Sequence, residues 1–518
     1  MVFYKGAFST IGIDDYLPYR LVGMALTVAA AALFLVLGAR RVGYLIALPG
    51  AVLLLFLGSS SEVTATALRI PTQIAVVAGL GMLLALERRD LRGDLAACVL
   101  LLVSITSHPL GTAFAAAAIV LVVARPIPER WRRAWVFGVP LLLFGAWYVT
   151  LRQPLPEGPG LGDQLGDLPR FEAESLAVMA AAATGVFRSP ISGEIHFLTP
   201  LTAVVAAVVA VTVCARALTT RMPASFWAIV AAALVLFAAP AFASGQVRSP
   251  AATRYIFPGV IMLLLLLAEV GHGANLKAHR VRVAAGVAVA VVFLFAIFSN
   301  ARVLEQNAQM WATVGSQVRA ALAAEDLARG HIDSTFRVED PFARPPIQLN
   351  FIALTAEQYF TTASTYGSPA FTPAQARAEP PAIRGVTDVI LARALALRLA
   401  PAGSLPRPSG TRPRVLSTTG EVHASMPGCV TLMPGGASPS SEIELPAGGV
   451  ALAGADERTI QLALARFGAI YTDHVEPLLS SGIASLKIPS DTDPTPWKLL
   501  IRGARRPVEA CGLAGGGG

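Results

Sequence analysis

Ten apolar stretches separated by short polar loops fill the first three hundred residues of the chain. Because an α-helix rises about 1.5 Å per residue, about 20 apolar residues cross the ~30 Å core of a bilayer. The pattern predicts membrane helices at about residues 20–39, 42–58, 70–87, 95–107, 110–124, 135–151, 199–216, 225–243, 255–270 and 282–299. The fourth and fifth are short and meet at Ser107–Gly111, where Pro and Gly predict a tight hairpin.

Positive charge is confined mainly to alternate loops. One set carries Arg40, Arg41, Arg88, Arg89, Arg92, Arg125, Arg130, Arg132, Arg133, Arg216, Arg221, Lys277, Arg280 and Arg282. The other set is acidic, with Glu62, Asp163, Asp167, Glu172 and Glu174, and later carries Arg248 and Arg254. Lys and Arg collect on the cytoplasmic side, so we predict a multi-pass plasma-membrane protein whose N-terminus and C-terminal region lie outside the cytoplasm. Only 19 residues precede the first helix and no signal sequence is evident, so we expect a further helix before Met1.

The hydrophobic pattern changes after residue 300. Residues 301–328 keep helical spacing, residues 340–410 are Pro-rich with a helix predicted at Thr387–Leu399, and from residue 411 the period becomes two. Strands are predicted at Cys429–Met433, Glu442–Leu445, Gly449–Leu452, Thr459–Ala465, Ala484–Ile488, Trp497–Ile501 and Val508–Cys511. Short strands between Gly, Pro and Asp turns are typical of a small β-sandwich.

These patterns predict three parts. Residues 1–299 form a polytopic α-helical membrane bundle with about ten transmembrane segments, and residues 300–410 form an extracytoplasmic helical and Pro-rich connector. Residues 411–518 form an extracytoplasmic, mainly-β sandwich domain that ends in a disordered Gly-rich tail, Gly515–Gly518.

Two cysteines lie in the first and last strands predicted for the sandwich. Cys429 and Cys511 are expected in an oxidising compartment, where a disulfide between them is favoured over two free buried thiols. Cys98 and Cys214 lie in membrane segments, and no metal-ligand spacing occurs among the four cysteines.

Composition agrees with a membrane protein. A mean hydropathy of +0.60, with 54% hydrophobic and 14% charged residues, is too apolar for a soluble enzyme of 518 residues. The net charge of +8 lies in short loops, without a basic stripe interleaved with aromatic residues. The bilayer is therefore the predicted partner, and nucleic acid is not.

Candidate chemistry collects on the predicted outer face, where we place Glu62, Gln73, His108, Arg188, Glu194, His196, Arg254 and Tyr255. Ionisable groups near membrane depth often line a substrate path. Taken singly, each of these residues is also explained as an outer-loop residue that lies in water or among lipid headgroups. His108 is suited to contact a phosphate, or simply to break a helix. Arg254 is suited to bind phosphate, or with Tyr255 to anchor the helix at the interface.

Two further acidic motifs are explained better by local structure. Asp14 and Asp15 precede the first membrane helix, where capping or a turn is favoured over a catalytic carboxylate pair. Asp491-Thr-Asp493 resembles an ion-binding or sugar-binding loop, but turn formation is again favoured.

The whole pattern resembles the GT-C superfamily of membrane glycosyltransferases, which use polyprenyl-phosphate sugars. Apolar hairpins, outer polar residues, the opening Arg254-Tyr255-Ile-Phe-Pro258 and an outer β-domain carry the resemblance. An actinobacterial branch without an assigned reaction is similar at Pro71–Gln73 through Glu87–Arg89, Ser104–Phe114, Trp135–Tyr148, Tyr366–Pro369, Ile488–Asp491 and Pro496-Trp497.

The resemblance implies a sugar transferred from a polyprenyl-phosphate donor to a cell-envelope glycan or other acceptor, with a divalent cation as the one cofactor to consider. The implied site for the lipid phosphate contains Glu62, Gln73, His108, Arg254 and Tyr255. GT-C enzymes carry the catalytic Asp or Glu on the first outer loop, and we expect that loop to lie for the most part before Met1 together with the helix that precedes it, so no catalytic residue is assigned.

The alternative is a non-catalytic, membrane-anchored glycan-binding or envelope-assembly protein. Exposed aromatic residues on the sandwich would favour this alternative. A transporter is disfavoured, because the sequence has neither midplane ionisable residues nor internal repeats.

Overall fold

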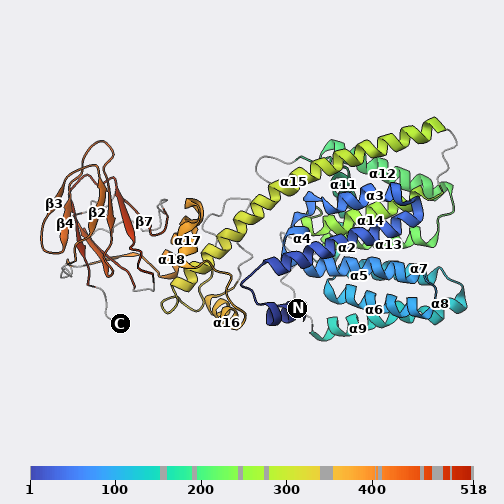
Figure 1. The fold of residues 1–518 in the computed structure, drawn as a ribbon, viewed down its shortest axis with the longest axis horizontal. Helices are drawn as coiled ribbons and strands as arrows, with labels where there is room; N and C mark the ends of the chain where they lie inside the picture. The colour runs from blue at the N-terminus through green and yellow to red at the C-terminus, as the bar shows by residue number, and fades with distance from the viewer. Residues whose placement is uncertain are drawn as a thin grey trace. The chain divides into compact units, whose positions relative to one another are not determined.

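The computed structural model describes residues 2–151, 160–188, 195–242, 249–273, 279–338, 354–402, 404–405, 411–454, 460–468, 482–489 and 493–514. These residues form two compact units (Figure 1). The first, here the membrane unit, is Tyr16–Trp311, and the second, the C-terminal unit, combines Met1–Asp15 with Ala312–Gly518. The division falls inside one long helix, α15 (His279–Leu327), whereas the sequence placed it at residue 299.

Helices make up the membrane unit. They are α2 (Leu17–Val42), α3 (Tyr44–Leu55), α4 (Ser61–Ala65), α5 (Ile70–Leu86), α6 (Leu91–Ser107), α7 (Gly111–Val123), α8 (Ile127–Arg133), α9 (Trp135–Leu151), α10 (Leu161–Gly166), α11 (Leu168–Thr184), α12 (Pro200–Thr219), α13 (Ala224–Ala238), α14 (Thr253–Gly271) and the first part of α15. The 3₁₀ turns are η1 (Gly58–Ser60), η2 (Ala67–Arg69) and η3 (Ala239–Phe242).

Seven helices in the described part of the chain are long and apolar enough to cross a membrane. The number is eight if the bent pair Tyr44–Leu55 and Gly58–Thr64 is one span. Each of the ten predicted segments coincides with a helix, but α6 and α7 have 17 and 13 residues and are shorter than a full span. The chain is thus a membrane protein with a helical bundle.

Helix α14 is the most enclosed candidate span, with 83% of its apolar window buried. Small residues let neighbouring helices approach closely, as is usual in membrane bundles. A Cβ added to Gly259 of α14 would collide with Met179 of α11, and one at Gly79 of α5 would collide with the Phe114 ring of α7. The side-chain amide of Asn300 donates to the carbonyl oxygen of Ala182 at 2.9 Å and so ties α15 to α11.

Helix α11 lies where the sequence predicted only an outer loop. Its second half, Ala177–Ala183, is buried in the hydrophobic core of the membrane unit. The hydropathy pattern missed it because the apolar stretch is short and Ala-rich, and because charged residues occupy the first half of the helix.

The C-terminal unit joins helices to a β-domain. Its helices are α1 (Val2–Ile11), α16 (Ala356–Tyr366), α17 (Pro373–Ala378), α18 (Pro381–Ala394) and the end of α15. Its strands are β1 (Leu399–Pro401), β2 (Arg414–Thr418), β3 (Val422–Ala424), β4 (Cys429–Leu432), β5 (Ser440–Glu444), β6 (Gly449–Ala453), β7 (Gln461–Ala465), β8 (Ile483–Lys487), β9 (Lys498–Arg502) and β10 (Val508–Gly512).

The strands form two antiparallel sheets, in the orders β1-β8-β6-β10-β4-β3 and β2-β5-β9-β7. Residues of both sheets, α18 and the end of α15 contribute to one hydrophobic cluster. All seven predicted strands are present, although Thr459 at the start of one lies outside the described residues, as does the predicted Gly515–Gly518 tail. The predicted helix Thr387–Leu399 is displaced, because Leu399 begins β1.

The predicted disulfide is confirmed. Cys429 and Cys511 are directly opposite each other on β4 and β10, with Cα atoms 4.1 Å apart, and they are joined through their sulfur atoms. Both residues are fully buried. The bond therefore links the first strongly buried strand of the β-domain to its last strand, 82 residues later.

We expect the double replacement Cys429→Ala and Cys511→Ala to lower the free energy of unfolding of the β-domain by about 2–4 kcal/mol, because the unfolded chain loses a long-loop constraint. Hydrogen exchange of the full-length protein, followed by mass spectrometry, should show faster exchange in β4 and β10. Replacing Cys98 and Cys214, which form no disulfide, is the matched control. Equal exchange in all three proteins would contradict a stabilising role.

Candidate functional site

The starts of α5 and α14 are linked by Glu62 of α4. One oxygen of its carboxylate, Oε1, accepts a hydrogen bond from Nε of Arg69 at 2.6 Å, and Nη2 of Arg69 contacts the same oxygen. The other oxygen, Oε2, accepts from the Thr253 hydroxyl, the first residue of α14. The Arg69 and Glu62 side chains are each only 17% exposed. A single carboxylate thus holds two helix starts together.

His108 lies in the turn between α6 and α7, outside either helix. Its Nδ1 accepts a hydrogen bond from the Leu110 backbone N–H at 3.2 Å, which only an unprotonated Nδ1 can do. Burial, together with the positive charges of Arg69 and Arg254, lowers the pKa of His108 to about 4. The ring is therefore neutral at pH 7, with its proton on Nε2 available to a hydrogen-bond acceptor.

Arg254 belongs to the first turn of α14, and its guanidinium carbon lies 4.9 Å from the centre of the Tyr255 ring. Tyr255 itself is buried, at 7% exposure. The structure thus brings together Glu62, His108 and Arg254 from the predicted set, with Tyr255 packed beside the arginine. We call Glu62, Arg69, His108, Thr253 and Arg254 the helix-start cluster.

Gln73, the fifth predicted residue, serves a different contact. Its side-chain amide donates to the Thr27 hydroxyl of α2 at 2.9 Å, and the residue is fully buried. Its Oε1 faces Gly23 of α2, where an added Cβ would lie 3.3 Å away. Gln73 therefore connects α5 to α2 one turn below the start of α5.

Sequence reasoning missed Arg69 and Thr253. Both precede or begin an apolar helix with an early proline, as Arg69-Ile-Pro71 and Thr253-Arg-Tyr-Ile-Phe-Pro258. The sequence feature that could have identified this site is a basic residue at the start of an apolar helix, in loops that otherwise carry few positive charges. Together the two motifs place two arginines at two neighbouring helix starts.

The other residues that the sequence placed on the outer face either form local backbone contacts or lie outside the described residues. Arg188 and His196 pair through their backbones, with N–H to oxygen distances of 3.0 and 2.7 Å. Glu194 lies outside the described residues. Glu172 of α11 is half-buried, and burial raises the pKa of its carboxyl to about 7.

The electrostatics of the helix-start cluster favour an anion. The five residues of the cluster include two guanidiniums, one carboxylate and one neutral imidazole, so their own charges sum to a positive value at pH 7. The positive ends of the α5 and α14 dipoles lie at the same place. Arginine also offers paired N–H donors that match phosphate oxygens.

A divalent cation does not fit this cluster. Its one carboxylate already bonds Arg69 and Thr253, and its other charged groups are cations. In the described part of the chain, the metal-type grouping that occurs is Cys429, Glu509 and Cys511, whose two cysteines are joined as a disulfide. No step is therefore assigned to a metal.

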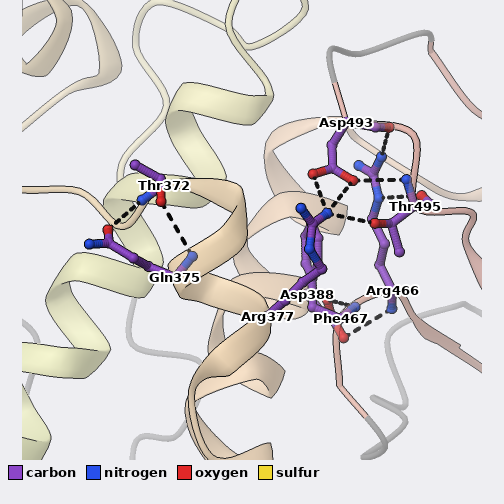
Figure 2. Close-up of polar contacts among 8 residues, drawn as sticks. All are labelled: Thr372, Gln375, Arg377, Asp388, Arg466, Phe467, Asp493 and Thr495. Carbon is purple, nitrogen blue, oxygen red and sulfur yellow. Dashed lines mark hydrogen bonds and ion pairs between the residues drawn. The ribbon is translucent and has the colours of Figure 1, made fainter.

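Figure 2 shows a second polar cluster, in the C-terminal unit, around Asp493. Its carboxylate accepts from the Thr495 backbone N–H and from Nη1 of Arg377 on α17, both at 2.8 Å. Arg466 donates to the backbone oxygens of Asp493 and Thr495 at 2.7 and 2.8 Å. Asp493 thus forms the predicted turn and pairs with Arg377, while Asp491 lies outside the described residues.

Asp388 of α18 fixes the end of β7. Its buried carboxylate accepts three backbone N–H bonds, from Arg466, Phe467 and Gly468, at 3.0, 2.9 and 2.8 Å (Figure 2). Burial raises the pKa of Asp388, whereas these bonds and the Arg466 charge act in the opposite direction. The contacts attach the β-domain to its helical layer and serve the fold.

No protein-family model matches the chain, and no curated protein matches it. The likeness to GT-C enzymes therefore rests on the sequence motifs alone.

We expect the His108 ring to titrate near pH 4. Because its pKa lies below the ordinary value of about 6.5, the folded protein binds that proton less readily than the unfolded chain. His108 therefore contributes stability that is complete above about pH 6.5 and is lost as the pH falls towards 4. Carbon-13 NMR of histidine-labelled protein, with His108→Gln to assign the signal, measures the midpoint, and a value near 6.5 would show that the ring is neither buried nor near the arginines.

The replacement Asp388→Ala should leave three buried N–H groups without their acceptor and destabilise the β-domain by about 3 kcal/mol or more. Chemical denaturation of the full-length protein measures the loss. Asp333→Ala is the control, because the Asp333 carboxylate caps only an exposed turn at Thr335, and we expect a cost below about 1 kcal/mol. A similar loss in the free energy of unfolding for both variants would contradict an anchoring role for Asp388.

Proposed function

We propose that the helix-start cluster binds the phosphate of a polyprenyl-phosphate sugar, and that the protein is a GT-C-like glycosyltransferase that transfers this sugar to a cell-envelope acceptor. The observation that carries the proposal is the gathering of Arg69, Arg254 and His108 at two helix starts that the Glu62 carboxylate links. The net charge, the helix ends and the donor geometry all favour a phosphate group.

The cluster lies at the opposite ends of α5 and α14 from the basic loop that contains Arg88 and Arg89. By the Lys/Arg bias, this arrangement supports a site on the outer side of a plasma membrane, with the β-domain on that side as well. Polyprenyl-phosphate sugars present their phosphate at a membrane surface and keep their chain in the hydrocarbon. A positive site at helix starts in a membrane bundle suits such a donor.

In an inverting transfer, the bond from the sugar anomeric carbon to the phosphate oxygen breaks, and a bond to the acceptor oxygen forms. The departing phosphate keeps the electron pair, and the acceptor proton passes to a carboxylate base. Arg69, Arg254 and the Nε2–H of His108 would stabilise the phosphate as its negative charge grows. Glu62 is not proposed as the base, because its two oxygens already bond Arg69 and Thr253.

That engagement of Glu62 favours the second candidate, a membrane-anchored protein that binds the lipid-linked glycan without catalysis. Stacking of sugars on the β-domain is less well supported. Phe467 and Trp497, the aromatic residues of its described part at 411–454, 460–468, 482–489 and 493–514, are only 5% and 2% exposed. Glycan contact through these rings would require them to leave the core.

We expect Arg254→Gln to weaken binding of undecaprenyl phosphate to the full-length protein in nanodiscs by roughly tenfold or more, because a charge-assisted contact is lost. Native mass spectrometry or a fluorescent-lipid titration measures the affinity. Arg216→Gln is the matched control, because Arg216 ends α12 and donates to the backbone oxygen of His272, at the ends of α12 and α14 away from the cluster. Equal affinities in the wild type and both variants would overturn the phosphate site.

A transfer assay separates the two candidates. Wild-type protein that binds the lipid and consumes a polyprenyl-phosphate sugar in the presence of envelope glycan is an enzyme. Binding without consumption of the donor favours the non-catalytic candidate.

A further inference from the structure

The other ends of the same helices enclose a small cavity. Its volume is about 70 Å³, and it lies among the final turns of α2, α5, α7 and α14 and the first turns of α13. Apolar side chains such as Leu83, Ile229 and Leu265 form much of its wall, and Arg41, Ser225 and Glu269 are among its polar lining. The volume holds a few water molecules, and hence a ligand head of a few non-hydrogen atoms.

The ion pairs around this cavity leave one carboxylate oxygen without a hydrogen-bond partner among the described residues. Nε of Arg41 donates to Oε1 of Glu269 at 2.7 Å, and Nη2 of Arg41 donates to Oε1 of Glu87 at 2.9 Å. Arg40 pairs with the remaining oxygen of Glu87. Oε2 of Glu269 has no hydrogen-bond partner among the described residues, although Glu269 is only 4% exposed. A buried acceptor left in this way is costly unless a ligand or water satisfies it.

The charge around Oε2 selects the sign of the ligand. Within the ion pairs at the cavity two arginines balance two glutamates, and the nearby helix ends add their dipoles. Helices α2, α5, α7 and α14 place their negative C-terminal ends here, against one positive start, that of α13. An anion would meet both these ends and the Glu269 carboxylate, with Arg41 already engaged. A positively charged hydrogen-bond donor is favoured.

We propose that this cavity binds a small primary ammonium group, which donates a hydrogen bond to Oε2 of Glu269. Its carbon atoms would pack against Leu83, Ile229 and Leu265. Calcium or magnesium is disfavoured, because these ions require about six oxygen ligands and the cavity wall is largely apolar. The ammonium group belongs either to a free amine or to the aminoethyl headgroup of a bilayer lipid.

The first experiment uses full-length protein in phosphatidylcholine nanodiscs and ethylammonium chloride as the probe. Saturation-transfer NMR of the ethyl group should show saturable binding, with a parallel rise in the melting temperature. Ethanol and tetramethylammonium chloride are the controls, because the first lacks the charge and the second lacks an N–H donor. Equal effects of all three compounds, or no saturable binding of ethylammonium, would overturn the proposal.

Two variants locate the site. Glu269→Gln keeps an oxygen for Arg41 but removes the anionic acceptor, so ethylammonium should bind roughly tenfold or more weakly. Ala228→Leu adds volume at a lining position and keeps every charge, so it should block binding even where Glu269→Gln does not fold. Glu174→Gln, in an exposed pair with Arg170 on α11, should bind as the wild type does. Unchanged binding in Ala228→Leu and Glu269→Gln would contradict the assigned site.

Nanodiscs that contain phosphatidylethanolamine distinguish the two sources. A lipid headgroup in the cavity would abolish the response of the wild type to added ethylammonium, and Ala228→Leu would then lose bound phosphatidylethanolamine in native mass spectra. An unchanged titration would identify a free amine as the ligand. This site lies at the opposite ends of α5 and α14 from the helix-start cluster, so either proposal can fail without the other.

Discussion

Glu62 accepts hydrogen bonds from Arg69 before α5 and from Thr253 at the start of α14, and the arrangement of the helix-start cluster depends on this double contact. Without the carboxylate, the positive charge of Arg69 would add to that of Arg254 beside the half-buried ring of His108. Ionic groups at membrane depth persist when they are paired. Both oxygens of the Glu62 carboxylate are engaged, by Arg69 and Thr253, while the charges of Arg69 and Arg254 both act on His108, and this arrangement makes the cluster suitable for a phosphate.

The two ends of α5 and α14 favour ligands of opposite charge, because side-chain charges and helix dipoles sum differently at each end. Both ends combine arginine with glutamate, and both lie in or beside a densely packed bundle. At the helix starts the charges sum to a positive value, and the helix dipoles add to it. At the far ends the charges cancel, most of the dipoles are negative, and one oxygen of Glu269 remains without a partner in the described part of the chain. An anion site and an ammonium site can therefore share the same pair of helices.

Much of the bundle could be predicted from the sequence, because an apolar run between charged loops has few alternatives to a buried helix. The prediction erred on α11, where the short Ala-rich run Ala177–Ala183 follows a charged first half of the helix and is buried by packing against neighbouring helices, for example at Gly259 of α14. It counted ten spans, whereas length and composition support seven or eight among the described residues, because α6 and α7 are short helices on either side of a hairpin. Strands β1, β2 and β3 were missed because few of their residues are buried.

The site could be predicted only in part. His108 and Arg254 were found because polar residues at helix starts are conspicuous beside apolar runs. Gln73 was included on the same basis, but its burial against α2 is a tertiary contact that sequence spacing does not show. Arg69 was missed because its role arises from Glu62, seven residues earlier, and from the distant start of α14. Such pairings depend on how helices assemble, which local pattern does not specify.

The most direct test of the central claim is a cryo-electron microscopy structure of the full-length protein in nanodiscs with undecaprenyl phosphate. We expect the lipid phosphate within hydrogen-bonding distance of Arg69 and Arg254, with the ring of His108 beside it. A phosphate bound instead at the basic loops around Arg88 and Arg130, with the helix-start cluster empty, would contradict the proposed phosphate site.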